Sequence, residues 1–542
     1  MIRSRKTRSS TEIPAVALLG LIFTLIFLAH VTLLRLPYFW DEAGYYIPAA
    51  HDLLTTGSLI PHSTLANPHP PLVMTWLALW WKLSGYTPAV TRTAMLLVSA
   101  FALLGVFRLA RQVANTSVAI AATALTALYP VWFAQSSLAQ LDVAAAAFTL
   151  WGLAAYLQRR LWAATTFFAI AGISKETAIV APVALLAWEV LSRVLGLRVV
   201  PSTSAESTSR GTQASAPRAE ITDQKSGINI SWPLALSVIP LACWLVFCYV
   251  RTGHVLGNAE FVRYNVAATL NPLRIVFAVV ERLWHAFGYM NLFALTGCMV
   301  LAMMSPPLPG RERDQIALPT QLVFAVLVAT YVLMLSVLGG AVLARYMLPV
   351  IPLVIIVAVS TLRRRVPWWT WLVALAALGF FAALISNPLY RSAPEDNLNY
   401  ADFVRLHKRA ADLIQQRYAH ARVLTAWPAS DELTHPYLGY VKEPVSVVRI
   451  ENFTLEQVTL AAQAKEQYDV ALLFSTKLEP EHPMLDRFAW WRGIQERFFD
   501  YHRDLPPQVA AQMLGGTVIF EGHRNGQWVA IVEFPRIFNA RR

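Results

Sequence analysis

The stretch that decides the fold is LPYFWDEAGYYIPAAHDLLTTGSLIPHSTLANPHPPL, residues 36–72. An acidic pair, Asp41 and Glu42, stands just past a membrane-length apolar run among aromatic residues, and His69 precedes two prolines near the end of the stretch. Aromatic side chains gather at membrane–water interfaces, and ionisable groups at the mouths of apolar segments are functional candidates. The stretch therefore predicts chemistry on a substrate that lies in the membrane surface.

Composition indicates a protein with many membrane spans. Of the 542 residues, 56% are hydrophobic and 14% are charged, whereas soluble globular proteins carry about 25% charged residues. The net charge of +12 comes largely from short Arg and Lys clusters between apolar runs, which is a topology signal rather than a nucleic-acid-binding face. We expect no nucleic-acid partner.

Eleven apolar runs near spanning length predict a mainly α-helical, polytopic protein. The expected spans are residues 14–34, 88–108, 116–133, 142–158, 161–174, 177–195, 232–250, 281–304, 318–338, 346–362 and 367–386. With the N-terminus in the cytoplasm, the main basic clusters between the runs fall on the cytoplasmic side, which puts the C-terminus outside. Residues 71–84 are nearly apolar enough to span, but we interpret them as a helix along the outer surface. In that position Trp76, Trp80 and Trp81 suit the interface, and Arg92 lies outside.

Two segments without a spanning pattern divide the chain further. Residues 197–230 are rich in Ser, Thr, Ala and Gly and predict a flexible cytoplasmic linker inside a transmembrane domain, 1–386. From 387 to 542 the apolar runs are short, which predicts a small soluble α/β domain on the outer face. Its expected helices are 400–418 and 454–467, and its expected strands are 423–427, 445–450, 470–474, 517–521 and 528–534.

Ionisable residues at the ends of several spans are the candidates for catalysis and binding. The set comprises Asp41, Glu42, Asp142, Lys175, Glu176 and Arg345, with Tyr346 and His69 beside them. Isolated burial of such charges costs several kcal/mol, so their presence at span ends calls for a role. Carboxylates and cations that converge at one depth would form a site.

Structural roles compete with each functional interpretation. The acidic residues are placed to cap the helices that follow, which is worth about 1 kcal/mol. Lys175 and Glu176 are neighbours that would neutralise each other in a turn, Arg345 would snorkel to headgroups, and His69 would be a rigid turn residue. Taken together, the set favours a site over separate structural roles.

The order of these motifs resembles the GT-C class of integral-membrane glycosyltransferases. The matching features are WDE after the first span, HPPL after a short loop, an Asp after AQSSLAQL, then SKET and ARYMLPVIPLV. The pattern is similar to bacterial members of the protein O-mannosyltransferase and aminoarabinose-transferase kind, including the RgtA/B/C/D-like group. It covers roughly residues 14–362, and we match no motif in 387–542.

The resemblance implies transfer of a sugar from a polyprenyl-phosphate-linked donor to an acceptor at the outer face of the cytoplasmic membrane. The family's catalytic carboxylate of the first outer loop maps onto Asp41, with Glu42 as its partner, and the acidic residue of the second outer loop maps onto Asp142. Aminoarabinose transferases have a Lys before the Pro-Pro. This chain has His69 there, which puts any phosphate-binding role of that position in doubt.

Residue chemistry independently suits such a transfer. A sugar on a lipid phosphate already has an acceptable leaving group, so the enzyme needs a base for the acceptor and cations for the departing phosphate. Asp41 would be the base in an in-line, inverting attack, and Arg345 with Lys175 would hold the phosphate. We leave the sugar, the acceptor (a protein, lipid or glycan) and a divalent cation shared by the acidic residues open.

Two other classes of function remain as alternatives. A transporter or flippase of lipid-linked glycan intermediates would place ionisable residues near the bilayer midplane and break helices there, whereas these residues cluster at one surface. An assembly or scaffold protein would leave the acidic residues and Arg345 without a role. A glycosyltransferase accounts for the pattern best.

Overall fold

The structure is a computed structural model that describes residues 14–194, 231–265, 269–478, 484–485, 487–499 and 501–535. The linker predicted over 197–230 lies outside the described residues.

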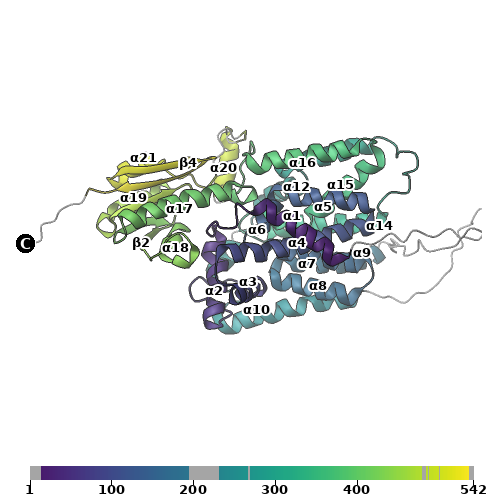
Figure 1. Cartoon of the computed structure of the whole chain (residues 1–542), viewed down its shortest axis with the longest axis horizontal. Coiled ribbons are helices and arrows are strands. Elements are labelled where there is room, and N and C mark those ends of the chain that lie inside the picture. Colours follow the sequence, from purple (N-terminus) through teal and green to yellow (C-terminus); the bar gives the residue numbers. More distant parts are fainter. Residues whose placement is uncertain are drawn as a thin grey trace, which may run out of the picture.

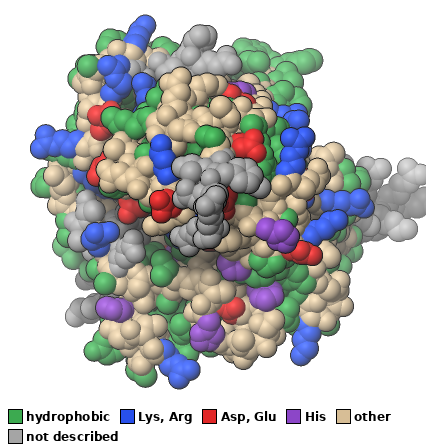
Figure 2. Space-filling model, turned by 90° about the vertical axis from the view of Figure 1, so that its left-hand side faces the viewer, with side chains coloured by type: hydrophobic (Ala, Val, Ile, Leu, Met, Phe, Trp, Pro, Cys, Tyr) green, Lys and Arg blue, Asp and Glu red, His purple; other side chains and the backbone are tan. Residues whose placement is uncertain are grey.

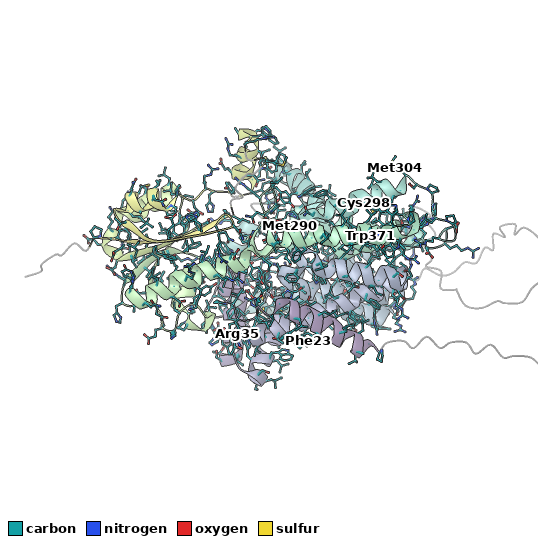
Figure 3. The ribbon with its side chains drawn as sticks, turned by 45° about the horizontal axis from the view of Figure 1, so that its top comes forward. Phe23, Arg35, Met290, Cys298, Met304 and Trp371 are labelled. Carbon is teal, nitrogen blue, oxygen red and sulfur yellow. The ribbon has the colours of Figure 1, made fainter. Side chains whose placement is uncertain are left out.

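Long apolar helices run side by side and form a bundle (Figure 1). They are α1 (Ala15–His30), α4 (Pro88–Val113), α5 (Thr116–Leu128), α6 (Pro130–Ser137), α7 (Asp142–Leu157), α8 (Leu161–Ser174), α9 (Val180–Val194), α10 (Ile239–Thr252), α12 (Pro272–Phe287), α13 (Leu292–Met303), α14 (Leu318–Val337), α15 (Ile351–Arg365) and α16 (Trp369–Ile385). Three further helices, α2 (Ile47–Thr56), α3 (Leu72–Ser84) and α11 (Ala259–Asn265), lie between them in the sequence. Figure 3 shows Arg35 at the end of the bundle that faces the C-terminal part and Met304 towards the opposite end.

Among the described residues, length and composition identify five helical segments that could cross a membrane, or six if α5 and α6 form one bent span. Helices α1, α7, α8 and α16 are apolar but shorter. The expectation of a mainly helical protein with several spans is therefore confirmed, while the number eleven stays a prediction.

Two predicted spans differ from the observed helices. The expected span 116–133 is bent by 68° between α5 and α6. Pro130 has no amide hydrogen and keeps Tyr129 out of the helical region, with ψ at 123°. The expected span 281–304 begins earlier, at Pro272. Arg274, which interrupts the apolar pattern ahead of the expected start, is buried, as is Arg282 inside the expected span.

Helix α3 confirms a helix over 71–84, but it is not simply a surface helix. It packs on α2 and α4 and buries Val73, Leu77 and Trp81. The indole of Trp81 donates to Oγ1 of Thr91 at 2.9 Å. The expected interfacial position of Trp81 was therefore wrong, because its polar atom finds a partner inside the protein.

The C-terminal part is built on one mixed sheet. Its strands are β1 (Arg422–Ala426), β2 (Ser446–Ile450), β3 (Val470–Phe474), β4 (Thr517–Arg524) and β5 (Gln527–Glu533), in the order β2-β1-β3-β5-β4. Strand β1 is parallel to β2 and β3, and β5 is antiparallel to β3 and β4. The helices are α17 (Asn399–Arg417), α18 (Ala429–Thr434), α19 (Leu455–Gln463), α20 (Ala489–Phe498) and α21 (Pro507–Leu514). All five expected strands and both expected helices are confirmed to within a few residues.

The sheet shares a hydrophobic core with the loop after α1. Tyr38 and Phe39 belong to the same buried cluster as Phe403 of α17 and Leu472 of β3. The hydroxyl of Tyr440 donates to the carbonyl oxygen of Tyr38 at 2.9 Å. The C-terminal part therefore fixes the position of the acidic first loop. Seen from the end that carries the C-terminal part, the molecule shows charged side chains and histidines among hydrophobic and other groups (Figure 2).

Candidate active site

Arg345 lies at the centre of a buried group of charged side chains from separate parts of the chain. Its Nη2 lies 2.5 Å from Oδ2 of Asp41, its Nη1 2.9 Å from Oε1 of Glu395, and its Nε 3.5 Å from Oδ2 of Asp142. Nη1 also donates to Oε1 of Gln140. The side chain of Arg345 is 3% exposed, whereas that of Asp41 is 20% exposed. We define the Arg345 cluster as Asp41, Asp142, Lys175, Arg345, Tyr346 and Glu395.

Lys175 brings a second cation into this cluster. Its Nζ lies 2.6 Å from Oδ1 of Asp142 and 3.8 Å from the centroid of the Tyr346 ring. The guanidinium carbons of Arg282 and Arg345 lie 5.3 and 5.6 Å from the same centroid. The face of an aromatic ring attracts cations. Tyr346 thus holds three cations near one another, and Asp142 bridges two of them.

A sharp change of backbone direction presents Asp41. Trp40 adopts a left-handed conformation, with φ at 42°, and Glu42–Tyr46 form a single π-helical turn. Such turns are frequent at functional sites. The ring of Trp40 packs edge-on against Trp427, 5.3 Å between centroids. Trp427 also passes so close to Gly44 that a Cβ there would lie 2.5 Å from its ring, which explains the glycine.

Arg282 supports the segment that carries Arg345. Arg345 stands in a short 3-10 turn, Ala344–Met347, ahead of α15. The fully buried Arg282 donates to the carbonyl oxygens of Leu343 at 2.6 Å and Ala341 at 3.4 Å. Sequence reasoning placed Arg282 inside the expected span 281–304 but did not single it out as a functional residue. A charged residue inside a long helix was the available signal.

Glu42 lies outside the Arg345 cluster. Both of its oxygens face the guanidinium of Arg92, at 2.8 and 3.0 Å, and both side chains are 0% exposed. The carboxylate also accepts from the backbone amides of Phe39 at 2.8 Å and Ala139 at 2.5 Å. Arg92, which the topology places on the outer side, is buried inside the protein. The pair ties the loop that carries Asp41 to the segment ahead of α7.

His69 and Glu176 form a separate contact near the cluster. Nδ1 of His69 lies 3.0 Å from Oε2 of Glu176. The direct partner of Glu176 is therefore His69 rather than its neighbour Lys175, which contacts Asp142. His69 is more than a turn residue before the prolines, because it connects the first loop to the start of the helical segment 176–194.

Sequence reasoning missed Glu395, which enters the cluster from the connection between α16 and α17. Its backbone oxygen accepts from Nε2 of Gln135 at 3.2 Å. Burial, reinforced by the nearby charges of Asp41 and Asp396, raises the pKa of Glu395 to about 8 despite the opposing effect of Arg345. Burial also raises the pKa of Asp396 to about 6, although its Oδ2 accepts from the hydroxyl of Tyr289 at 2.6 Å. No motif marks this segment.

The immediate surroundings of Asp41 are aromatic and close to a small pocket. Burial, followed by the charge of Asp41, raises the pKa of Tyr46 well above its usual value. Tyr46, His69 and Trp244 line the pocket. A larger cavity of about 290 Å³ lies between Leu36–Pro37 and α17, and no residue of the Arg345 cluster lines it.

A shared divalent cation finds little support in the described part of the chain. No group of three or more His, Cys, Asp or Glu side chains there is arranged to hold a metal ion. Asp41, Glu42 and Asp142 each face a basic side chain instead.

Comparison with solved structures identifies the fold. ArnT from Cupriavidus metallidurans in the apo state matches with a TM-score of 0.51 and 13% identity, covering 96% of this chain and 98% of that chain. The same protein bound to undecaprenyl phosphate matches with a TM-score of 0.49, 13% identity and 95% and 97% coverage. The archaeal oligosaccharyltransferase AglB from Archaeoglobus fulgidus, in complex with an inhibitory peptide and a dolichol-phosphate, matches with a TM-score of 0.45 and 12% identity. That match covers 94% of this chain and 74% of that chain. The fold is that of ArnT.

A family model for dolichyl-phosphate-mannose-protein mannosyltransferases matches residues 68–203. No curated protein matches the chain in sequence. The family match over residues 68–203 and the ArnT-like fold both agree with the resemblance to GT-C class glycosyltransferases. The resemblance noted in the sequence is thereby confirmed, as is a multi-pass membrane protein.

Proposed function

We propose that this chain moves a sugar from a polyprenyl-phosphate-linked donor to an acceptor at the outer face of the cytoplasmic membrane. The observation that carries this proposal is the convergence of Asp41, Asp142, Lys175 and Arg345 on one buried cluster from distant segments. Such a cluster supplies both a carboxylate base and cations for a phosphate leaving group. The acceptor is a lipid, a glycan or a protein.

Asp41 acts as the general base in this proposal. The acceptor hydroxyl or amine attacks the anomeric carbon, its proton passes to the Asp41 carboxylate, and the bond between that carbon and the phosphate oxygen breaks. The leaving group is the polyprenyl phosphate, and attack opposite to it inverts the anomeric configuration. Among the carboxylates that face Arg345, Asp41 is 20% exposed, Glu395 5% and Asp142 3%, which favours Asp41 for contact with an acceptor.

Arg345 and Lys175 bind the phosphate. Phosphate oxygens make short, charge-assisted hydrogen bonds to Arg and Lys. The donor phosphate competes with Asp41 for Arg345 and frees the carboxylate for the acceptor. Tyr346 keeps the two cations together, and the His69–Glu176 pair borders the donor.

The surrounding architecture follows from the same proposal. Residues 1–386 form the catalytic membrane domain with the N-terminus in the cytoplasm, and residues 387–542 form a soluble domain on the outer side. Basic residues such as Arg311 and Arg363 lie on the cytoplasmic side by the positive-inside rule. The side chain of Arg311 donates to the backbone oxygen of Arg363.

Transfer of radiolabelled sugar from polyprenyl-phosphate donors to a membrane extract tests the proposal. We expect purified wild-type protein to transfer label and Asp41→Asn to lose transfer when the two preparations are matched for folding. Asp412→Asn is the matched control, because Asp412 is an exposed carboxylate that pairs with Lys408 far from the cluster. Full activity of Asp41→Asn would refute its role as the base. Movement of unmodified labelled lipid across the bilayer, without transfer, would favour the flippase alternative.

A further inference from the structure

Helix α20 is amphipathic but has no buried residue. Its sequence is AWWRGIQERF, and Phe488 precedes it. Trp490 is 60% exposed and Phe488 is 40% exposed. Large aromatic side chains at such exposure in a ten-residue helix call for a partner outside the described chain.

Both ends of this segment are attached to the ends of membrane helices. On one side, the amide of Met484 donates to the carbonyl oxygen of Leu389, just beyond α16, at 2.9 Å. On the other side, Nε of Arg274 in α12 donates to the carbonyl oxygen of Phe498 at 3.2 Å. The ring of Phe498 also packs 5.6 Å from that of Phe277. The segment therefore lies at the edge of the bundle.

The apolar surface of the bundle continues up to α20. Leu273 and Val276 on α12 are each 59% exposed, and so is Leu389, beyond α16. These side chains lie on segments bonded to the α20 region, and their exposure on a spanning bundle is that of lipid-facing residues. Figures 1 and 3 show α20 running across, rather than along, the direction of the spanning helices.

We propose that α20 lies in the interface of the lipid bilayer and contacts phospholipid directly. Trp490 and Phe488 occupy the boundary between headgroups and acyl chains, where tryptophan is enriched. Arg487 and Arg497, at the two ends of the segment, face the headgroup phosphates. Continuity with the lipid-facing surface of α12 and α16 favours lipid over a protein partner. The proposal does not depend on the transfer reaction.

Lipid contact at α20 would also brace the loop that leads to Arg345. Arg274 holds the carbonyl oxygen of Phe498 and, through Nη2, those of Gly339 at 3.0 Å and Gly340 at 2.6 Å. The end of α20 and the backbone ahead of Arg345 thus share one guanidinium. In this proposal, the backbone at Gly339 and Gly340 is thereby fixed at the depth of the membrane surface.

Site-specific photo-crosslinking in liposomes tests this proposal. We would replace Trp490 with benzoylphenylalanine in the full-length protein, reconstitute it in phosphatidylethanolamine–phosphatidylglycerol liposomes, irradiate it and analyse adducts by mass spectrometry. The matched control is Leu460, an apolar residue that is 52% exposed. It belongs to α19, which lies in the C-terminal part at the end away from the bundle (Figure 1).

We expect phospholipid adducts at position 490 and none at position 460. Absence of lipid adducts at 490 would overturn the proposal, and so would a crosslink from 490 to a second copy of the chain. Because both substituted side chains are exposed, neither variant is expected to unfold. The readout is independent of sugar transfer, so failure of this proposal is distinguishable from failure of the proposed function.

Discussion

Removing the charge of Glu42 should destabilise the protein strongly, because Arg92 would then be a buried cation without a counter-ion. Both side chains are fully buried, and the carboxylate receives two bonds from Arg92 and two from backbone amides. Breaking a buried ion pair from one side typically costs about 3–5 kcal/mol. We therefore expect Glu42→Gln to lower the free energy of unfolding by about that amount.

A double-mutant cycle measures this coupling. The variants are Glu42→Gln, Arg92→Met and the double substitution, each compared with wild type by denaturant unfolding in detergent. Because Arg92→Met also removes the orphaned cation, the double variant should lose less stability than the sum of the two single variants, by about 3 kcal/mol for a contact this close. Additive single losses, or a Glu42→Gln variant as stable as wild type, would refute the reasoning.

Three further predictions concern the Arg345 cluster. Glu395 carries a proton until the pH passes about 8, so we expect the KM for the donor to rise above about that pH, as a new negative charge appears beside Arg345, and Glu395→Gln to flatten the profile. The same raised pKa predicts that folding stability falls as the pH rises from about 4.5 to about 8, because the carboxyl of Glu395 ionises in the unfolded chain before it ionises in the folded protein. A pH series of melting temperatures for wild type and Glu395→Gln tests this. Parallel curves for the two proteins would contradict it. Lys175→Met should raise the donor KM and also lower the melting temperature, because it leaves Asp142 with the longer contact to Arg345; steady-state kinetics with an unchanged KM would count against a phosphate-binding Lys175.

Patterns within one segment could be predicted from the sequence. The strands and helices of the C-terminal part follow from periodicity, and β3 was predicted without error as 470–474. Two predicted spans differ from the observed helices, because a single residue in each overrides the apolar pattern. Pro130 bends a run that is apolar throughout, and the inward-facing Arg274 interrupts the apolar pattern in the first turn of α12.

Pairings between distant segments could not be predicted in the same way. The acidic pair of the first loop looked like one functional unit, yet its members face different cations: Asp41 contacts Arg345, and Glu42 contacts Arg92. Neighbours in a turn point in different directions, and each finds a partner through tertiary packing. Glu395 was missed for the same reason, since an acidic residue in a polar connection carries no signal until the fold brings it 2.9 Å from Arg345.

The charge balance of the cluster explains why Asp41, rather than Asp142, is proposed as the base. Asp142 bridges Lys175 and Arg345 and is 3% exposed, so its removal from either cation would strand a buried charge. Asp41 has the more exposed side chain and contacts Arg345 through one oxygen. Arg345 already contacts both Asp41 and Asp142, so an arriving phosphodiester competes with a carboxylate for its guanidinium. The carboxylate that leaves at the lowest cost is Asp41, so donor binding itself would free the base at the position where the acceptor arrives.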